Sequence, residues 1–168
     1  LGAAHFIVRQ GAGIENPSDL RGKAVKLGDL GSGDYAISLV LLEHLGLDKQ
    51  SFDHRYVDYS NVKEAFLKGT LDAAFITSGV QAPIFPDLFQ TGKATLLSIP
   101  NAEAFAAKHV SMSRYRIPAG LYLSRNPISP LTDIHTVAVN TQLLARASTQ
   151  ARLVEEVTKI VLSEEFQK

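Results

Sequence analysis

The stretch that decides the fold is Ala24-Val25-Lys26-Leu27-Gly28-Asp29-Leu30-Gly31-Ser32-Gly33-Asp34, residues 24–34. Its first five residues are apolar except for one lysine and predict a short strand. The glycine-rich turn that follows leads directly into a predicted helix over residues 34–45, which Gly46 is placed to end. A strand, a turn and a helix in this order form the repeating unit of an α/β fold.

The same rhythm continues on both sides of this stretch. Upstream, residues 4–9 predict a strand and residues 16–22 a single helical turn. Downstream, helices are predicted after Ser60 or Asn61, from Pro83 and after Asn101, and strands are predicted over residues 55–58, 71–77 and 94–99. Alternating strands and helices predict an α/β fold: a parallel-type sheet with right-handed crossovers and helices on both faces.

The last third of the chain has a different pattern. Residues 114–125 read as an extended segment, and Pro127 and Pro130 mark a linker. A strand over 136–140 and an amphipathic helix over 149–162 follow, and the apolar side of that helix is expected to be buried: Leu153, Val157, Ile160 and Val161. One strand and one helix after a proline-marked bridge indicate part of a second layer.

Composition excludes several classes of function. Lysine plus arginine equals aspartate plus glutamate, at 17 each, so the chain as a whole has no attraction for nucleic acid. Cysteine is absent, and the five histidines lack the spacing of metal ligands, so we expect no metal site. No nucleophile elbow, phosphate loop or carboxylate pair is present, so we expect no catalytic residue, no cofactor and no enzyme. The chain starts at Leu1 without a methionine or a signal peptide, and we expect it to be processed or trimmed.

Two loops are the candidate binding elements. The carboxyl ends of parallel strands meet at one edge of a sheet, so the loops at 29–34, 58–61 and 77–83 should converge there. The two candidates are the turn at 31–34, in the first of these loops, and the loop at 77–83. Backbone amides of the first and hydroxyls and amides of the second can grip a polar ligand, or both loops can simply cap their helices. A tyrosine beyond the predicted lobe can face the pocket or pack a hinge. The candidate ligand-binding residues are Gly31, Ser32, Gly33, Asp34, Thr77, Ser78, Gly79, Val80, Gln81 and Tyr122.

These motifs, in this order, resemble a known family. Ser18–Val25 followed by Leu27-Gly28 and Gly31-Ser32-Gly33, then Ala65–Phe75 and Ile117–Tyr122, are similar to passages of type II periplasmic binding proteins. The best resemblance is to the TAXI-type solute receptors of TRAP transporters, within the NMT1/THI5-like superfamily. The resemblance covers most of residues 6–162.

The resemblance implies one lobe of a two-lobed protein that closes on a small solute. Residues 1–113 would be the ligand-binding lobe with an entering hinge strand. Residues 114–168 would be the return hinge and the C-terminal strand and helix of a first lobe that is mostly absent. The family's typical solutes are acidic amino acids and organic carboxylates, delivered outside the cytoplasm, in the periplasm, to a membrane permease. Asp34 departs from the family's threonine and would repel such an anion, unless it caps the helix.

Two alternative functions remain open, and the absence of the first lobe would have a consequence for the surface of the chain. A sensor domain of a membrane signalling protein would use the same lobe and the same site. The run Lys26–Asp34 also resembles the first motif of S-adenosylmethionine-dependent methyltransferases, with Asp58 placed to hold a ribose. If the first lobe is absent, the surface left bare is expected to be partly apolar and to be covered by a homodimer or a segment swap.

Overall fold

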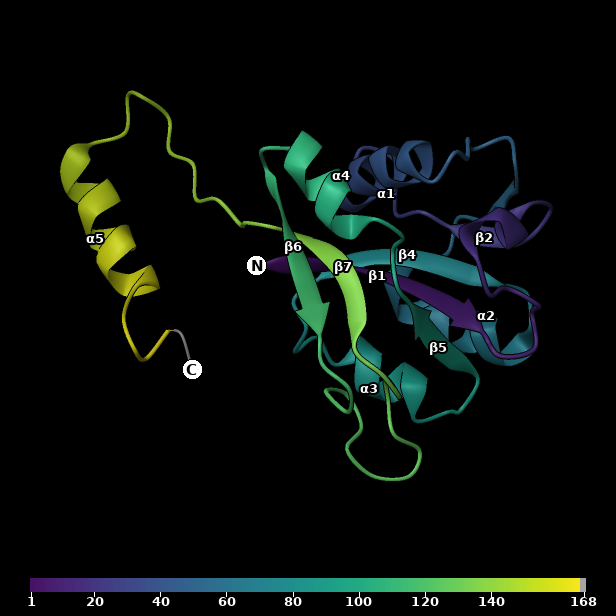
Figure 1. Cartoon of the computed structure of the whole chain (residues 1–168). Coiled ribbons are helices and arrows are strands. Elements are labelled where there is room, and N and C mark those ends of the chain that lie inside the picture. The colour runs from purple at the N-terminus through teal and green to yellow at the C-terminus, as the bar shows by residue number, and fades with distance from the viewer. Residues whose placement is uncertain (167–168) are drawn as a thin grey trace.

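A single sheet organises the chain in the computed structural model, which describes residues 1–166 (Figure 1). Seven strands have the order β3-β2-β4-β1-β7-β6, and β5 also pairs with β1. The strands are β1 (Gly2–Arg9), β2 (Ala24–Lys26), β3 (Asp53–His54), β4 (Ala73–Ser78), β5 (Ala94–Leu97), β6 (Met112–Ile117) and β7 (Ile134–Val139). The helices are α1 (Gly33–His44), α2 (Val62–Lys68), α3 (Ile84–Phe89), α4 (Ala102–Lys108) and α5 (Ala151–Val161), with short 3-10 turns η1 (Pro17–Leu20) and η2 (Tyr59–Asn61).

The sheet is mixed rather than wholly parallel. β2 runs parallel to both β3 and β4, as the strand–helix rhythm predicts. β1 runs antiparallel to β4, β5 and β7, and β6 runs antiparallel to β7. The predicted α/β class is therefore confirmed, but the expectation of a parallel sheet is wrong around β1. The reason is that the neighbours of β1 lie far from it in sequence, so no strand–helix–strand crossover sets its direction.

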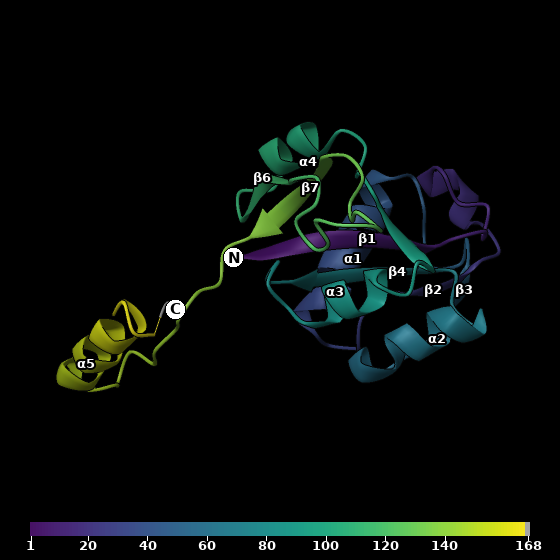
Figure 2. The ribbon, with the colours of Figure 1, turned by 90° about the horizontal axis from the view of Figure 1, so that it is seen from below.

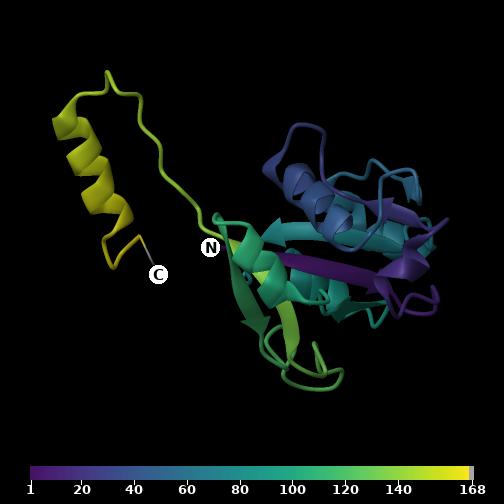
Figure 3. The ribbon, with the colours of Figure 1, turned by 45° about the horizontal axis from the view of Figure 1, so that its top comes forward.

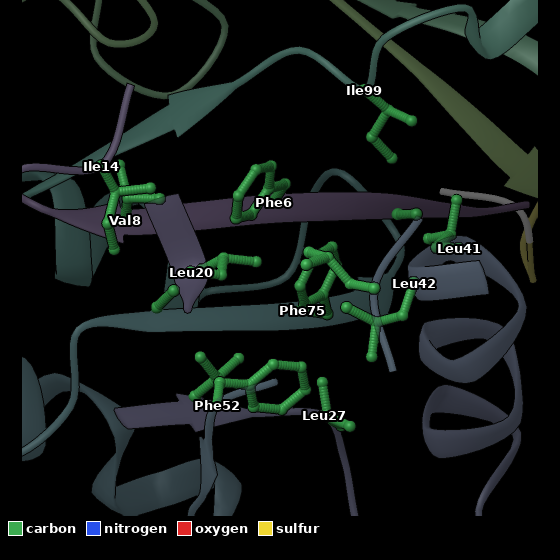
Figure 4. Packing of buried hydrophobic residues seen from close by; sticks show 14 of the residues in the cluster. Phe6, Val8, Ile14, Leu20, Leu27, Leu41, Leu42, Phe52, Phe75 and Ile99 are labelled. Carbon is green, nitrogen blue, oxygen red and sulfur yellow. The ribbon is translucent and has the colours of Figure 1, made fainter. Parts of the chain in front are cut away.

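Helices cover both faces of the sheet, and each face has its own core. On one face α1 and α4 pack over Phe6 and Phe75, whose rings stack with centroids 4.7 Å apart (Figure 4). On the other face α2 and α3 bury Phe66 and Phe85 against the sheet. The central strand β1 supplies residues to both cores because successive side chains of a strand point to opposite faces.

Local signals placed most elements correctly. Gly46 and Gly69 follow α1 and α2 with φ of 70°, the left-handed conformation that ends a helix. The strand predicted over residues 55–58 is wrong, since β3 comprises Asp53 and His54 and pairs with the start of β2. Residues 55–58 lie beyond this pairing and lead into η2.

The last helix lies apart from the sheet. Figure 1, Figure 2 and Figure 3 all show α5 at the end of an extended linker, away from the other elements. None of its residues, all of which the structure describes, is buried, so the prediction that Leu153, Val157, Ile160 and Val161 are buried is wrong. Its apolar side instead lines an open groove of about 530 Å³ together with Leu143 and Leu144 of the linker. Within residues 1–166 no helix has the length and apolar character needed to cross a bilayer.

Removing residues 141–168 is expected to change the free energy of unfolding by less than about 1 kcal/mol, because residues 141–166 are almost all exposed. Urea denaturation followed by circular dichroism measures this. A chain that ends at residue 133 is the control, and it should lose cooperative unfolding because β7 buries Val137 and Ala138. A large loss of stability in the chain that ends at residue 140 would contradict the finding that α5 lies apart from the sheet.

Candidate functional site

The carboxyl ends of β2 and β4 lie at the same edge of the sheet because the two strands are parallel. The chain leaves β2 through Gly28, whose φ of 108° is open only to glycine, and turns into α1. A Cβ at this glycine would lie 2.7 Å from the backbone nitrogen of Tyr35, so the first turn of α1 sits directly against the end of β2. Because Gly28 has no side chain, the start of α1 can lie against the end of β2 at this edge of the sheet.

Asp34 joins the two candidate loops. Its Oδ1 accepts a hydrogen bond of 2.7 Å from the backbone N–H of Thr77, near the end of β4. Burial raises the pKa of Asp34, while the Thr77 N–H and the positive charge of Lys26 act in the opposite direction. The turn at 31–34 and the start of the loop at 77–83 therefore lie side by side.

The first loop combines a cap with free donors. The Ser32 hydroxyl accepts from the Tyr35 N–H at 3.1 Å, so Ser32 is the N-cap of α1. Within residues 1–166, the amides of Gly33 and Asp34 have no hydrogen-bond acceptor. Gly31, Gly33, Gly79 and Gln81 are exposed, and Ser32, Asp34, Thr77, Ser78 and Val80 are half-buried. All of the predicted site residues except Tyr122 thus lie in two loops at one edge of the sheet. The amides of Gly33 and Asp34 are the two donors there without an acceptor in residues 1–166.

Tyr122 lies in a different contact. Its hydroxyl is 2.6 Å from Nε2 of His5, and its ring packs against Phe85 and Phe89 of α3. The Nδ1 of His5 lies 2.8 Å from the carbonyl of Ala3 and 3.2 Å from that of Ile76, so Nδ1 carries the proton and Nε2 accepts from the tyrosine. Burial lowers the pKa of His5 to about 4 and raises the pKa of Tyr122. The hydrogen bond from Tyr122 to His5 connects the segment between β6 and β7 to β1. Contact between Tyr122 and a ligand stays a prediction.

Two polar residues at this edge were not among the predicted ones. Lys26, the last residue of β2, is only 3% exposed. His54, in β3, has its ring beside those of Tyr35 and Tyr56, with centroids 5.8 and 4.4 Å away. A lysine within a predicted strand, in a sheet expected to have helices on both faces, was the available signal, since lysine is almost never fully buried without a role or a partner.

The chemistry available at the edge is that of binding. The groups present include backbone amides, hydroxyls, one lysine, one histidine and the carboxylate of Asp34, which is already held by the Thr77 amide. In the part of the chain that the structure describes, no group of three or more histidine, aspartate or glutamate side chains is arranged to hold a metal ion. The arrangement is suited to holding a small polar molecule through donated hydrogen bonds.

Known structures share this fold over nearly the whole chain in one case and over about two thirds of it in another. The alkanesulfonate-binding protein SsuA from Xanthomonas axonopodis pv. citri, bound to MOPS, is similar with a TM-score of 0.53 and 18% identity, over 96% of this chain and 49% of that protein. A structure from Bordetella bronchiseptica RB50 is similar with a TM-score of 0.51 and 19% identity, over 63% of this chain and 35% of that one. The chain therefore spans about half the length of the SsuA protein and less of the other.

A periplasmic binding protein of high arginine specificity from Salmonella typhimurium is similar with a TM-score of 0.47 and 18% identity, over 99% of this chain and 58% of that chain. The similarity to SsuA supports the fold expected from the sequence, one lobe of a type II periplasmic binding protein. The sequence model of the NMT1-like family matches residues 2–167, almost the entire chain. The chain therefore belongs to the NMT1-like family.

Proposed function

We propose that the chain is the ligand-gripping lobe of an extracytoplasmic solute receptor, and not an enzyme. The solute is a small polar molecule, an amino acid or an organic carboxylate, which the receptor delivers to a membrane permease of the TRAP type, as the TAXI-like motifs imply. The residues that hold it are Gly31, Ser32, Gly33, Asp34, Thr77, Ser78, Gly79, Val80 and Gln81, with Tyr122 as a further contact from the hinge.

The observation that carries the proposal is the hydrogen bond between Asp34 and the Thr77 amide. It connects the two loops that follow β2 and β4, and this proximity supports a shared site for their polar groups at the edge of the sheet. Crevices beyond the carboxyl ends of parallel strands are the usual ligand sites of α/β proteins. The amides of Gly33, which is exposed, and of Asp34, which is half-buried, have no acceptor within residues 1–166 and so support this site.

The chain enters and leaves the sheet at the same edge. Gly2 at the start of β1 is paired with Val139 at the end of β7, and Ala3 is paired with Ser78 at the end of β4. A second lobe joined through these two crossings would face the crevice. We assign residues 1–113 to the binding lobe and residues 114–168 to the return hinge and the C-terminal part of the other lobe, whose core would cover the apolar groove along α5.

Solute binding can be tested on the chain by two-dimensional NMR titration. The probes are glutamate, succinate, glutamine and arginine, with S-adenosylmethionine as the probe for methyltransferase activity. We expect weak binding, because only one lobe is present, with amide shifts concentrated at residues 31–34 and 77–81. Shifts confined to other parts of the chain, or tight binding of S-adenosylmethionine alone, would refute the proposal.

A further inference from the structure

The segment that joins β6 to β7, residues 118–133, is attached to the rest of the sheet by a single hydrogen bond. Among residues 1–166, all its other hydrogen bonds stay within residues 116–133. The exception is the bond that the Tyr122 hydroxyl donates to Nε2 of His5 in β1, across 2.6 Å. Release of the segment from the sheet therefore requires this one bond and the ring contacts of Tyr122 to break.

The histidine end of this bond lies in the core. His5 is 0% exposed, and its ring stacks on that of Phe85 with centroids 3.8 Å apart. Its Nδ1 lies 2.8 Å from the carbonyl of Ala3 and 3.2 Å from that of Ile76, which leaves the Tyr122 hydroxyl as the partner of Nε2. A second proton, on Nε2, would create a buried charge with one hydroxyl oxygen beside it, and burying a charge in this way is costly. The closed arrangement is therefore suited to the neutral imidazole.

No charged side chain offsets the cost of protonating His5. Burial lowers the pKa of His5 to about 4, although its two carbonyl partners act in the opposite direction, and no charged group contributes. The strands β4 and β5 carry no titratable side chain. The titratable or charged residues on the other elements around His5 are Arg9 of β1, Asp87 of α3, Arg114, Tyr115 and Arg116 of β6, Tyr122, Arg125 and Asp133 of the segment, and His135 of β7. All of them are exposed or half-buried, and among them only Tyr122 is hydrogen-bonded to His5.

Opening of the segment would give Nε2 of His5 water in place of the tyrosine. In water the pKa of the imidazole returns toward its ordinary value of 6.5, so a proton binds the open form more tightly than the closed form. As the pH falls from 6.5 to 4, the ratio of open to closed chains can rise by up to about 300-fold. The stabilisation of the closed form is thus complete above pH 6.5 and lost below pH 4.

We propose that the bond between His5 and Tyr122 is an acid-sensitive latch, which holds residues 118–133 on the sheet at neutral pH and releases them in acid while the sheet stays folded. The inference goes beyond the proposed function and does not depend on it, because a chain that binds no solute would still show the release. Release would uncover Phe85 and Phe89 of α3, which are 0% and 2% exposed in the closed form. The latch would therefore present apolar surface on this side of the sheet only in acid.

The test is NMR spectroscopy of the chain between pH 7 and pH 4, with labels in the backbone amides and in the tyrosine rings. The ring signals of Tyr122 and the amide signals of residues 118–133 report release of the segment. The amide signal of Phe75, in the core of β4, reports whether the sheet stays folded. We expect the segment signals to change between about pH 5 and pH 4 while the Phe75 signal stays in place.

Three variants connect the release to the latch. Tyr122→Phe keeps the ring on α3 but removes the hydrogen bond to Nε2, so release should move to higher pH by about half a unit to one unit. His5→Phe cannot bind a proton, so the segment signals should no longer change in this range. His135→Gln alters an exposed histidine of β7, and in this matched control the release should match that of the unaltered chain.

The outcomes decide between the latch and other effects of acid. Segment signals that stay constant down to pH 4 would overturn the latch. A joint loss of the segment and Phe75 signals would also overturn it, because acid would then unfold the whole chain at once. Release that persists in His5→Phe would assign it to another group. If His5→Phe does not fold, Tyr122→Phe decides: a shift to higher pH supports the latch, and no shift contradicts it.

Discussion

Replacing Gly28 by alanine is expected to lower the free energy of unfolding by about 3 kcal/mol or more, and to separate the two loops of the crevice. The added Cβ would lie 2.7 Å from the Tyr35 nitrogen and 3.1 Å from the backbone carbon of Asp34, and the backbone φ of 108° is strained for any side chain. The neighbours are backbone atoms of α1, so the helix has to move. Urea denaturation measures the loss of stability, and hydrogen exchange at the Thr77 amide reports the loss of its bond to Asp34.

Gly31→Ala is the matched control for this change. Gly31 also has a positive φ, of 81°, but a Cβ there would have no heavy atom within 4 Å. Its substitution should cost only about 1–2 kcal/mol, the penalty of the left-handed conformation alone, and should leave exchange at Thr77 unchanged. If the two alanine variants are equally stable, the close approach of α1 to β2 is not what positions the crevice.

Acidification is expected to destabilise the protein by about 3 kcal/mol through His5 alone. The pKa of His5 is about 4 in the folded chain and 6.5 in the unfolded chain, so the unfolded state binds the extra proton first as the pH falls. The stabilisation is complete above pH 6.5, falls between pH 6.5 and 4, and is lost below pH 4. Protonation would also place a donor against the Tyr122 hydroxyl, which donates to Nε2 at neutral pH.

The measurement is the free energy of unfolding in urea as a function of pH, compared between the unaltered chain and His5→Phe. The variant keeps a ring to stack on Phe85, whose centroid lies 3.8 Å from that of His5, but cannot titrate. It should be less stable at pH 7 and show a smaller fall in stability between pH 6.5 and 4. His135→Gln alters an exposed histidine and should retain the full dependence. An identical pH dependence in His5→Phe would show that His5 is not the group responsible.

Much of the fold could be read from local sequence patterns. Gly46 ends a helix as predicted, and the strand predicted over residues 71–77 is β4, although its bounds are Ala73–Ser78. For the candidate site, the prediction that residues 31–34 and 77–81 share one edge rested on the parallel pairing of the strands before them. The structure pairs those strands as β2 and β4. The role of Asp34 between the two loops was not predicted, because its partner, Thr77, lies 43 residues away.

The sequence by itself determined the α/β class, the order of strands and helices, and the two polar turns, because these depend on periodicity and on backbone preferences within a few residues. Only the tertiary structure decided the antiparallel placement of β1, the bond between His5 and Tyr122 across 117 positions, and the burial of Lys26. Each of these is a contact between segments that are distant along the chain. Its geometry follows from how the sheet is assembled, and no local pattern encodes that assembly.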